Sequence, residues 1–271
     1  MATIYTDRAD LEHGWATSTD VADTVQRRSV LALAESTARP SEVMGARTIR
    51  RDDIVATNLG RPAGYWNAAV ITRPLDGPGW ARALRAINEL EGPSAGINSA
   101  VDLWSPFPTP DLRGDGWELA GHPVAMWRPP TPLQRAPATT LHIERVRDVA
   151  GIEEWARAAV ECYPLDAEPT AIATPDLLAA DDVHLHVGRV GGDPVAVSAT
   201  VVTFGTNAVA LVAVRDDARG RGHGRAITWA ATAVRPDLPA TLLASDEGRP
   251  VYEDLGYLAH SRWTMWVRPG R

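Results

Sequence analysis

The stretch that decides the fold is Leu211-Val212-Ala213-Val214, followed after four residues by Arg219-Gly220-Arg221-Gly222-His223-Gly224-Arg225. The first segment is apolar, as is typical of a strand, and the second is a glycine loop that precedes a helical apolar pattern. Such a loop can bind phosphate, because glycines let the backbone turn tightly and the helix N–H groups point at the anion. The local positive charge comes from Arg215, Arg219, Arg221 and Arg225.

Two common phosphate-binding motifs do not fit this loop. The dinucleotide fingerprint G-x-G-x-x-G fails, because its last glycine would fall at Arg225 or Ile227. A P-loop requires lysine, and all 27 basic residues of the chain are arginine. The pattern that fits is Arg/Gln-x-x-Gly-x-Gly/Ala, at Arg219, Gly222 and Gly224. A glycine-rich turn that binds no ligand is the alternative.

A second motif follows at 244–257, which reads ASDEGRPVYEDLGY. It is a strand end and then a short helix carrying Tyr-Glu-x-Leu-Gly-aromatic. In this order and at this spacing, the two motifs resemble the acetyl-CoA signatures of the GNAT (GCN5-related N-acetyltransferase) superfamily. The resemblance is specific over 138–271 and weak over 1–130, where the glycine motif is missing.

The resemblance implies a role for individual residues. Val212 and Val214 would offer backbone groups to the pantetheine arm of acetyl-CoA, and the glycine loop would hold its pyrophosphate. Tyr252 would be the general acid that protonates the departing thiolate; a buried structural tyrosine is the alternative. The full set implied to bind the cofactor is Val212, Val214, Arg219, Gly220, Arg221, Gly222, His223, Gly224, Arg225 and Ser245.

The general base is not identified by the sequence. Many relatives place a glutamate on the strand before the loop, but residues 206–214 contain no carboxylate. The candidates, none of them assigned, are Glu161, His184, His186 and Asp246. Cys162 is the only cysteine, and we interpret it as a packing residue.

Composition excludes several other classes of protein. The net charge of −7 argues against nucleic-acid binding. A single cysteine and the absence of an HExxH pair argue against a metal site. No segment is apolar enough for a membrane span and the N-terminus has no signal pattern, so we expect a cytoplasmic protein.

The chain divides near its middle. Four prolines within 129–137 predict an extended linker. We therefore expect a degenerate GNAT-like domain at 1–130, a linker at 131–137 and an acetyl-CoA-binding catalytic domain at 138–271. Residues 111–128 end in a Gly-aromatic-strand pattern similar to that of 254–268, which indicates two copies of one fold. Chance similarity is the alternative.

The predicted fold class is α/β, with each domain a central mixed sheet flanked by helices. In the second half we expect strands at 140–146, 183–190, 194–204, 208–214, 240–244 and 257–267, and helices at 152–163, 227–234 and 250–255. In the first half we expect helices at 7–28 and 79–90 and strands at 67–72 and 94–103.

The resemblance implies an acetyl-CoA-dependent N-acetyltransferase that acts on the amine of a small molecule or peptide by direct attack in a ternary complex. The alternatives are a catalytically inactive acyl-CoA-binding or sensor protein and a protein that uses the fold only as a scaffold. No metal is expected. Two fused copies are compatible with a monomer, and a homodimer remains open.

Overall fold

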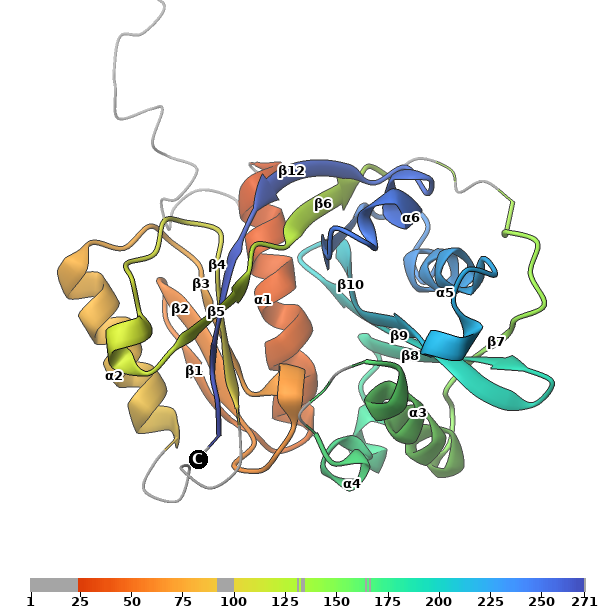
Figure 1. Cartoon of the computed structure of the whole chain (residues 1–271), viewed down its shortest axis with the longest axis horizontal. Coiled ribbons are helices and arrows are strands. Elements are labelled where there is room, and N and C mark those ends of the chain that lie inside the picture. Colours follow the sequence, from red (N-terminus) through yellow and green to blue (C-terminus); the bar gives the residue numbers. More distant parts are fainter. Residues whose placement is uncertain are drawn as a thin grey trace, which may run out of the picture.

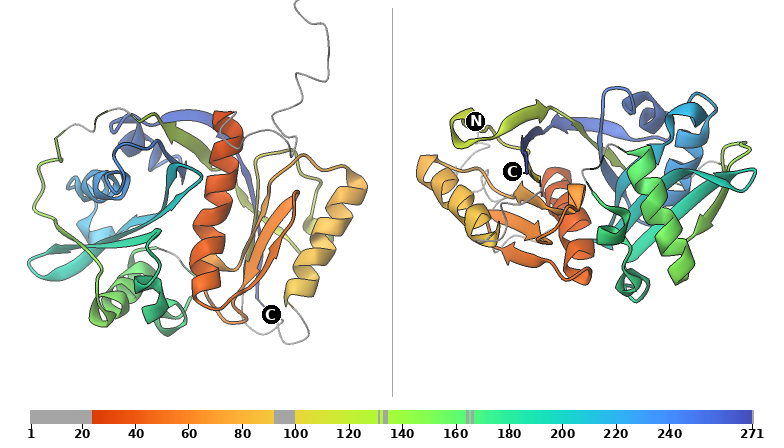
Figure 2. Two further views of the ribbon diagram at one scale, coloured as in Figure 1. Left: turned by 180° about the vertical axis from the view of Figure 1, so that it is seen from behind. Right: turned by 60° about the horizontal axis from the view of Figure 1, so that its bottom comes forward.

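The computed structural model describes residues 24–91, 100–130, 132, 135–163, 165 and 167–270. They form two mixed β-sheets, and a long helix, α1, stands between the sheets (Figures 1 and 2). The predicted fold class, mixed sheets flanked by helices, is confirmed. Within the described part of the chain, no helix combines the length and apolarity needed to cross a membrane.

The first sheet has six strands in the order β1-β2-β3-β4-β13-β5. Neighbours run antiparallel except β3 and β4, which are parallel. The strands are β1 (Arg47–Arg50), β2 (Ile54–Asn58), β3 (Ala68–Ile71), β4 (Val101–Ser105), β13 (Thr264–Arg268) and β5 (Glu118–Gly121).

The second sheet has seven strands in the order β12-β6-β11-β10-β9-β8-β7, and here β10 and β11 are the parallel pair. The strands are β12 (Leu258–Arg262), β6 (Val124–Arg128), β11 (Ala240–Ala244), β10 (Thr206–Val214), β9 (Asp193–Thr203), β8 (Val183–Val190) and β7 (His142–Arg145).

The same strand order occurs twice, since β1-β2-β3-β4 corresponds to β8-β9-β10-β11. The two halves also exchange strands. β6 from the first half lies between β11 and β12, and β13 from the second half lies between β4 and β5. The prediction of one continuous strand at 257–267 was therefore wrong, because the chain leaves the second sheet at Trp263 and enters the first.

Helices cover both sheets. α2 packs on the first sheet away from α1, whereas α3 and α5 pack on the second sheet. The helical elements are α1 (Val25–Val43), η3 (Gly64–Trp66), α2 (Gly77–Glu91), η4 (Arg113–Asp115), α3 (Val149–Cys162), α4 (Pro169–Ile172), η5 (Pro175–Leu178), η6 (Asp216–Ala218), α5 (His223–Thr232) and α6 (Arg249–Glu253).

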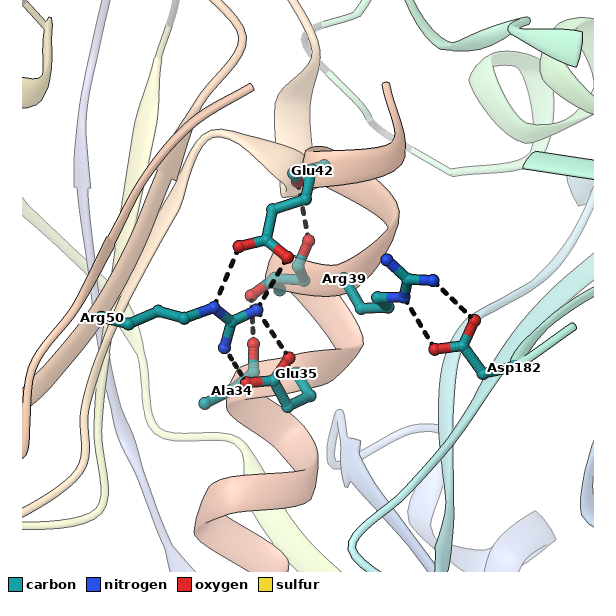
Figure 3. A network of polar contacts seen from close by, with 8 residues as sticks. Ala34, Glu35, Arg39, Glu42, Arg50 and Asp182 are labelled. Atoms are coloured by element: carbon teal, nitrogen blue, oxygen red, sulfur yellow. Dashed lines mark hydrogen bonds and ion pairs between the residues drawn. The ribbon is translucent and has the colours of Figure 1, made fainter. Parts of the chain in front are cut away.

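α1 joins the two sheets. It contacts β2 on one side and β9 and β10 on the other. On the side of the first sheet, Arg50 of β1 binds Glu35 and Glu42 of the helix; on the other side, Arg39 pairs with Asp182 at 2.7 Å (Figure 3). Partly exposed ion pairs contribute little free energy, so these contacts mainly fix the orientation of the helix.

The sequence prediction for the first half was incomplete. A helix was expected at 7–28, and residues 7–23 of that range lie outside the described residues. The described helix, α1, starts at Val25 and runs to Val43. Strands β1 and β2 were not predicted. The strand expected at 94–103 is seen from Val101, and its first part lies outside the described residues.

Candidate active site

β10 carries a β-bulge near its end. Its pairing with β9 runs from Thr206 to Ala210, is interrupted at Leu211 and Val212, and resumes at Ala213. Leu211 has a φ of 49°, in the left-handed region that residues other than glycine seldom occupy. Bulges of this kind occur beside functional sites, where they redirect a strand or end its pairing.

β10 also separates from its other neighbour, β11. The two strands pair only at Asn207 with Ala240 and Ala208 with Thr241, although they continue to Val214 and Ala244. Beyond the paired residues, the facing edges of two parallel strands diverge. An extended ligand with amide groups can add to such an edge through main-chain hydrogen bonds.

The glycine loop leads from β10 into α5. Gly220 and Gly222 have φ values of 74° and 79°, which glycine adopts without the strain that a Cβ would introduce. Gly222 is the N-cap of α5 and supplies no side-chain hydrogen bond, and the first helical bond is Ala226 N–H to Gly222 C=O. The N–H groups of the first turn are therefore available to an anion at the positive end of the helix dipole.

Two buried polar atoms of this turn have no partner among the described residues. They are Nδ1 of His223, whose side chain is 1% exposed, and Nε of Arg225. Nε2 of His223 lies 3.3 Å from the Thr140 hydroxyl. A buried polar atom left without a partner costs free energy, so both atoms fit a site that a polar ligand completes.

Two arginines near the loop, Arg215 and Arg219, form ion pairs with aspartates. Arg215 pairs with Asp193 at 2.6 Å and with Asp217 at 2.7 Å, and these hydrogen bonds raise its pKa. Arg219 pairs with Asp216 and donates from Nε to the Val214 carbonyl. The local positive charge expected from the sequence is thus partly neutralised by neighbouring aspartates.

A cavity of about 360 Å³ opens where β10 and β11 diverge. Both halves of the chain line it. The second half contributes β10 at Val209–Val212, the end of β11, Tyr163 and Tyr252; the first half contributes α1, Tyr65, Trp104 and the turn between β5 and β6. The cavity therefore connects the open strand edge with the space between the sheets.

Tyr252 lies on α6 with its side chain in this cavity. It is 9% exposed, and burial raises the pKa of its hydroxyl above the usual range. The hydroxyl therefore keeps its proton at neutral pH and can donate it. Tyr257 packs edge-to-face against Tyr252 at 6.1 Å and fixes the ring.

The other expected cofactor residues are distributed around the same region. Val212 and Ser245 line the cavity, and the Ser245 hydroxyl accepts a hydrogen bond from Gly248 N–H at 3.0 Å. Val214 lies further along β10, packed against α5, outside the lining residues. The structure thus brings Val212, Ser245 and Tyr252 to one cavity and places the glycine loop at the end of the strand that leads to it.

Of the four candidate bases, only Asp246 lines the cavity, and it is paired with Arg262 at 2.8 Å. His186 lines a different hollow, beside α5, and burial lowers its pKa to about 4. Its neighbour on the same strand face, His184, has a pKa lowered to about 4 by burial as well. Burial raises the pKa of the Cys162 thiol to about 11, which fits a packing role.

Sequence reasoning missed the aromatic wall of the cavity. Tyr65, Trp104 and Tyr163 lie in three separate segments, and their convergence depends on how the two sheets pack. No local sequence pattern marks these three residues. Among the described residues, no cluster of three His, Cys, Asp or Glu side chains could hold a metal ion.

Comparison by sequence gives no match, either to a protein-family model or to a curated protein. Solved structures do match. A GCN5-related N-acetyltransferase from Kribbella flavida aligns with a TM-score of 0.62 at 20% identity, covering 89% of this chain and 96% of that one.

Two further structures show the same likeness. A GCN5-related N-acetyltransferase-like protein from Streptococcus suis 89/1591 aligns with a TM-score of 0.52 at 14% identity, covering 90% of this chain and 98% of its own. A GCN5-related N-acetyltransferase from Sphaerobacter thermophilus aligns at 0.51 and 17%, covering 83% and 77%. Each alignment is too long to lie within one half, so it includes parts of both. This chain therefore has the fold of the GCN5-related N-acetyltransferases, the GNAT superfamily.

Proposed function

We propose that the chain is an acetyl-CoA-dependent N-acetyltransferase that transfers the acyl group to an amine of a small molecule or peptide within a ternary complex. The observation that carries the proposal is the arrangement at the end of β10. A bulge and an open strand edge lead directly into a glycine loop and an uncapped helix N-terminus. These features suit a ligand with an extended amide arm and a pyrophosphate.

The residues present fit acetyl-CoA. The pyrophosphate would accept hydrogen bonds from the first turn of α5, and Arg221 and Arg225 would add positive charge. The pantetheine arm would pair with the edge of β10 at Val212. Bound there, acetyl-CoA would supply an activated acetyl thioester in the cavity.

Tyr252 would act as the general acid. Tyr252 lines the cavity, and its neutral hydroxyl would protonate the thiolate as the carbon–sulfur bond breaks. A thiol pKa of about 8.5 lies below the raised pKa of this tyrosine, so proton transfer from Tyr252 to the thiolate is unfavourable by itself. It is completed when Tyr252 takes a proton back from the nitrogen of the attacking amine.

The test is calorimetric titration of acetyl-CoA into the wild type and a Gly222→Glu variant. The glutamate places a negative charge where the pyrophosphate should lie, so micromolar binding by the wild type should be lost. Gly205→Glu is the matched control, since Gly205 also has a positive φ but lies in the hairpin at the other end of β10. If neither the wild type nor the control binds while both are folded, the proposal is wrong.

An inactive acyl-CoA-binding or sensor protein is the second candidate function. It is favoured by the absence of a carboxylate from β10 and by the pairing of Asp246 with Arg262. Release of free CoA thiol in the presence of a panel of primary amines separates the two functions. Only the enzyme turns over, and only its turnover depends on Tyr252.

A further inference from the structure

The turn between β5 and β6 brings a histidine of the first half to the cavity. His122 is exposed and lies among the lining residues, so it stands where the cavity opens to solvent. The turn carries the chain from the first sheet to the second, and Trp263 carries it back between β12 and β13. Trp263 N–H donates to the Pro123 carbonyl at 2.9 Å, and the Arg262 guanidinium donates to the His122 carbonyl at 2.7 Å. The two crossings therefore hold each other in place.

One ring nitrogen of His122 has a partner from the other half of the chain. Nδ1 lies 3.4 Å from the hydroxyl of Thr264, the first residue of β13. When Nδ1 carries the ring proton and donates to this hydroxyl, Nε2 presents a lone pair that can accept a proton. Imidazole gains and loses its proton near neutral pH, so the same atom can take a proton from a ligand and then release it to solvent.

The other titratable groups of the cavity are less suited to accept a proton. Three of them are the tyrosines Tyr65, Tyr163 and Tyr252. Burial raises the pKa of all three, so their hydroxyls keep their protons at neutral pH. The Asp246 carboxylate binds Arg262 at 2.8 Å, and carboxylates as a class are weaker bases than imidazole. Among the described lining residues, His122 carries the one imidazole.

The wall that the first half contributes to the cavity is apolar and aromatic. Tyr65 and Trp104 pack edge-to-face with ring centroids 6.4 Å apart, and Leu33 and Met265 belong to the same hydrophobic cluster. Arginine is the only basic side chain in the sequence apart from histidine, yet the described lining residues include no arginine. A ligand body that fills this part of the cavity should therefore be apolar or aromatic.

We propose that His122 is the catalytic base of the transferase: its imidazole takes the proton that the ammonium group of a primary amine must lose, and the aromatic wall binds the apolar body of that amine. The inference rests on the proposed function and deepens it. It supplies, from the first half of the chain, the base that β10 does not contain. The sequence did not point to His122, because its place at the cavity depends on the exchange of strands between the sheets.

The proton balance of the reaction is complete with His122 and Tyr252. The ammonium gives one proton to Nε2 of His122, and the free amine then forms the carbon–nitrogen bond with the thioester carbonyl. As the carbon–sulfur bond breaks, Tyr252 protonates the sulfur and regains a proton from the nitrogen of the new amide. His122, which is exposed, then releases its proton to solvent.

The first experiment measures kcat/KM for the acetylation of 2-phenylethylamine by the wild type and three variants. We expect His122→Gln to lower kcat/KM about 100-fold, because glutamine cannot take the proton. His142→Gln is the matched control: His142 is an exposed histidine on β7, bonded to Glu144 at 2.9 Å and outside the lining, so the wild-type rate should be kept. Asp246→Asn, at the other exposed titratable group of the lining, should cost less than about 10-fold.

Two further kinetic measurements separate a chemical role from a structural one. Free imidazole should raise the activity of His122→Ala at least about 10-fold, because the exposed position admits a small base from solvent. Ethylamine has the same ammonium group without the aromatic ring. With the wild type, its kcat/KM should be at least about 10-fold below that of 2-phenylethylamine, since it buries less apolar surface against the wall.

Proton NMR gives a readout that requires no turnover. The Cε1–H resonance of His122 is identified as the signal that is missing from His122→Gln. It should shift when 2-phenylethylamine is added without acetyl-CoA, and the signal that is missing from His142→Gln should not. The Kd of acetyl-CoA, measured by calorimetry, should be the same in the wild type and all variants.

The contrary results are distinguishable from one another. If His122→Gln keeps the wild-type rate, or if Asp246→Asn loses more than it does, the base lies elsewhere and the transferase proposal survives. A loss in His122→Gln without imidazole rescue and without the NMR shift would make the residue structural. If the wild type acetylates other amines but not 2-phenylethylamine, the inferred acceptor class is wrong. If it turns over no amine at all, both proposals fail.

Discussion

The same strand–loop–helix unit occurs twice in the chain, and only one copy is open. In the first half, β3 leads to α2, and the carboxylate of Asp76 accepts a hydrogen bond from Gly79 N–H at 2.7 Å. This side chain places its own negative charge at the helix N-terminus. In the second half, β10 leads to α5, whose N-cap is a glycine without a side chain. The first helix N-terminus therefore carries its own anion, whereas the second carries none.

The strands before the two helices also differ in how fully they pair with the next parallel strand. β3 pairs with β4 through three of its four residues, without a register shift. β10 pairs with β11 through two of its nine residues and is bulged at Leu211. One fold therefore gives a closed edge in one half and an open edge in the other, and both differences support the proposed cofactor site in the second half.

The largest expected effect on acetyl-CoA binding comes from a glutamate in the first turn of α5, compared with a glutamate in the corresponding turn of α2. Gly224→Glu in the first turn of α5 should abolish detectable acetyl-CoA binding by calorimetry, a loss of at least about 100-fold, because the carboxylate occupies the anion site. A Cβ at Gly224 meets only Val214 Cγ2 at 3.8 Å, so the fold should be retained. Gly77→Glu, in the corresponding turn of α2, should bind like the wild type. Equal losses in both variants would contradict the assignment.

Removal of the Tyr252 hydroxyl should have the next largest effect. Tyr252→Phe should lower kcat about 100-fold and leave the Kd of acetyl-CoA unchanged, because only proton donation is lost. Tyr257→Phe is the control: its hydroxyl bonds to Thr232 at 2.7 Å, away from the reacting atoms, so it should lower stability by about 1 kcal/mol and spare kcat. An active Tyr252→Phe enzyme would remove this residue from the mechanism.

Asp102 on β4, whose carboxyl has its pKa raised by partial burial, should reduce stability at alkaline pH. The pKa of Asp102 is about 7 in the folded chain and 3.8 in the reference state, so the folded form holds the proton more tightly. Stability is therefore lost as pH rises from about 4 through 7. Asp102→Asn should be more stable than the wild type by about 1–3 kcal/mol at pH 8.5 and similar at pH 4. Urea titrations at the two pH values test this, and a variant less stable at pH 8.5 would contradict it.

The smallest effect is expected at the closed copy of the unit. Asp76→Ala removes the cap of α2 and should cost about 1 kcal/mol of unfolding free energy, measured by urea titration. It should leave acetyl-CoA binding unchanged, since this half is not assigned a cofactor site. Binding of a second acetyl-CoA after this substitution would show that Asp76 alone separates the two halves.

The sequence predicted the second half well because its signals are local. β-branched runs and glycine turns marked β8, β9 and β10, and the strand, the glycine loop and the helix follow one another directly in the chain from Thr206 to Thr232. α1 escaped prediction because its buried face is made of small and polar side chains that give no clear apolar period, and it contains Pro40. Among these, Ser36 and Ser41 are buried and donate to carbonyls of their own helix at 2.7 Å, so their hydroxyls stay paired where the helix packs between the sheets.

By itself, the sequence determined the class of fold and the glycine loop, together with the position of Tyr252 after it, because each depends on residues close together in the chain. Only the tertiary structure decided which strands share a sheet. The exchange of β6 and β13 depends on pairing between segments more than 100 residues apart, which no local pattern encodes. The cavity has the same origin: Trp104, Tyr163 and Tyr252 come from three distant segments, and they converge because α1 holds the two sheets face to face.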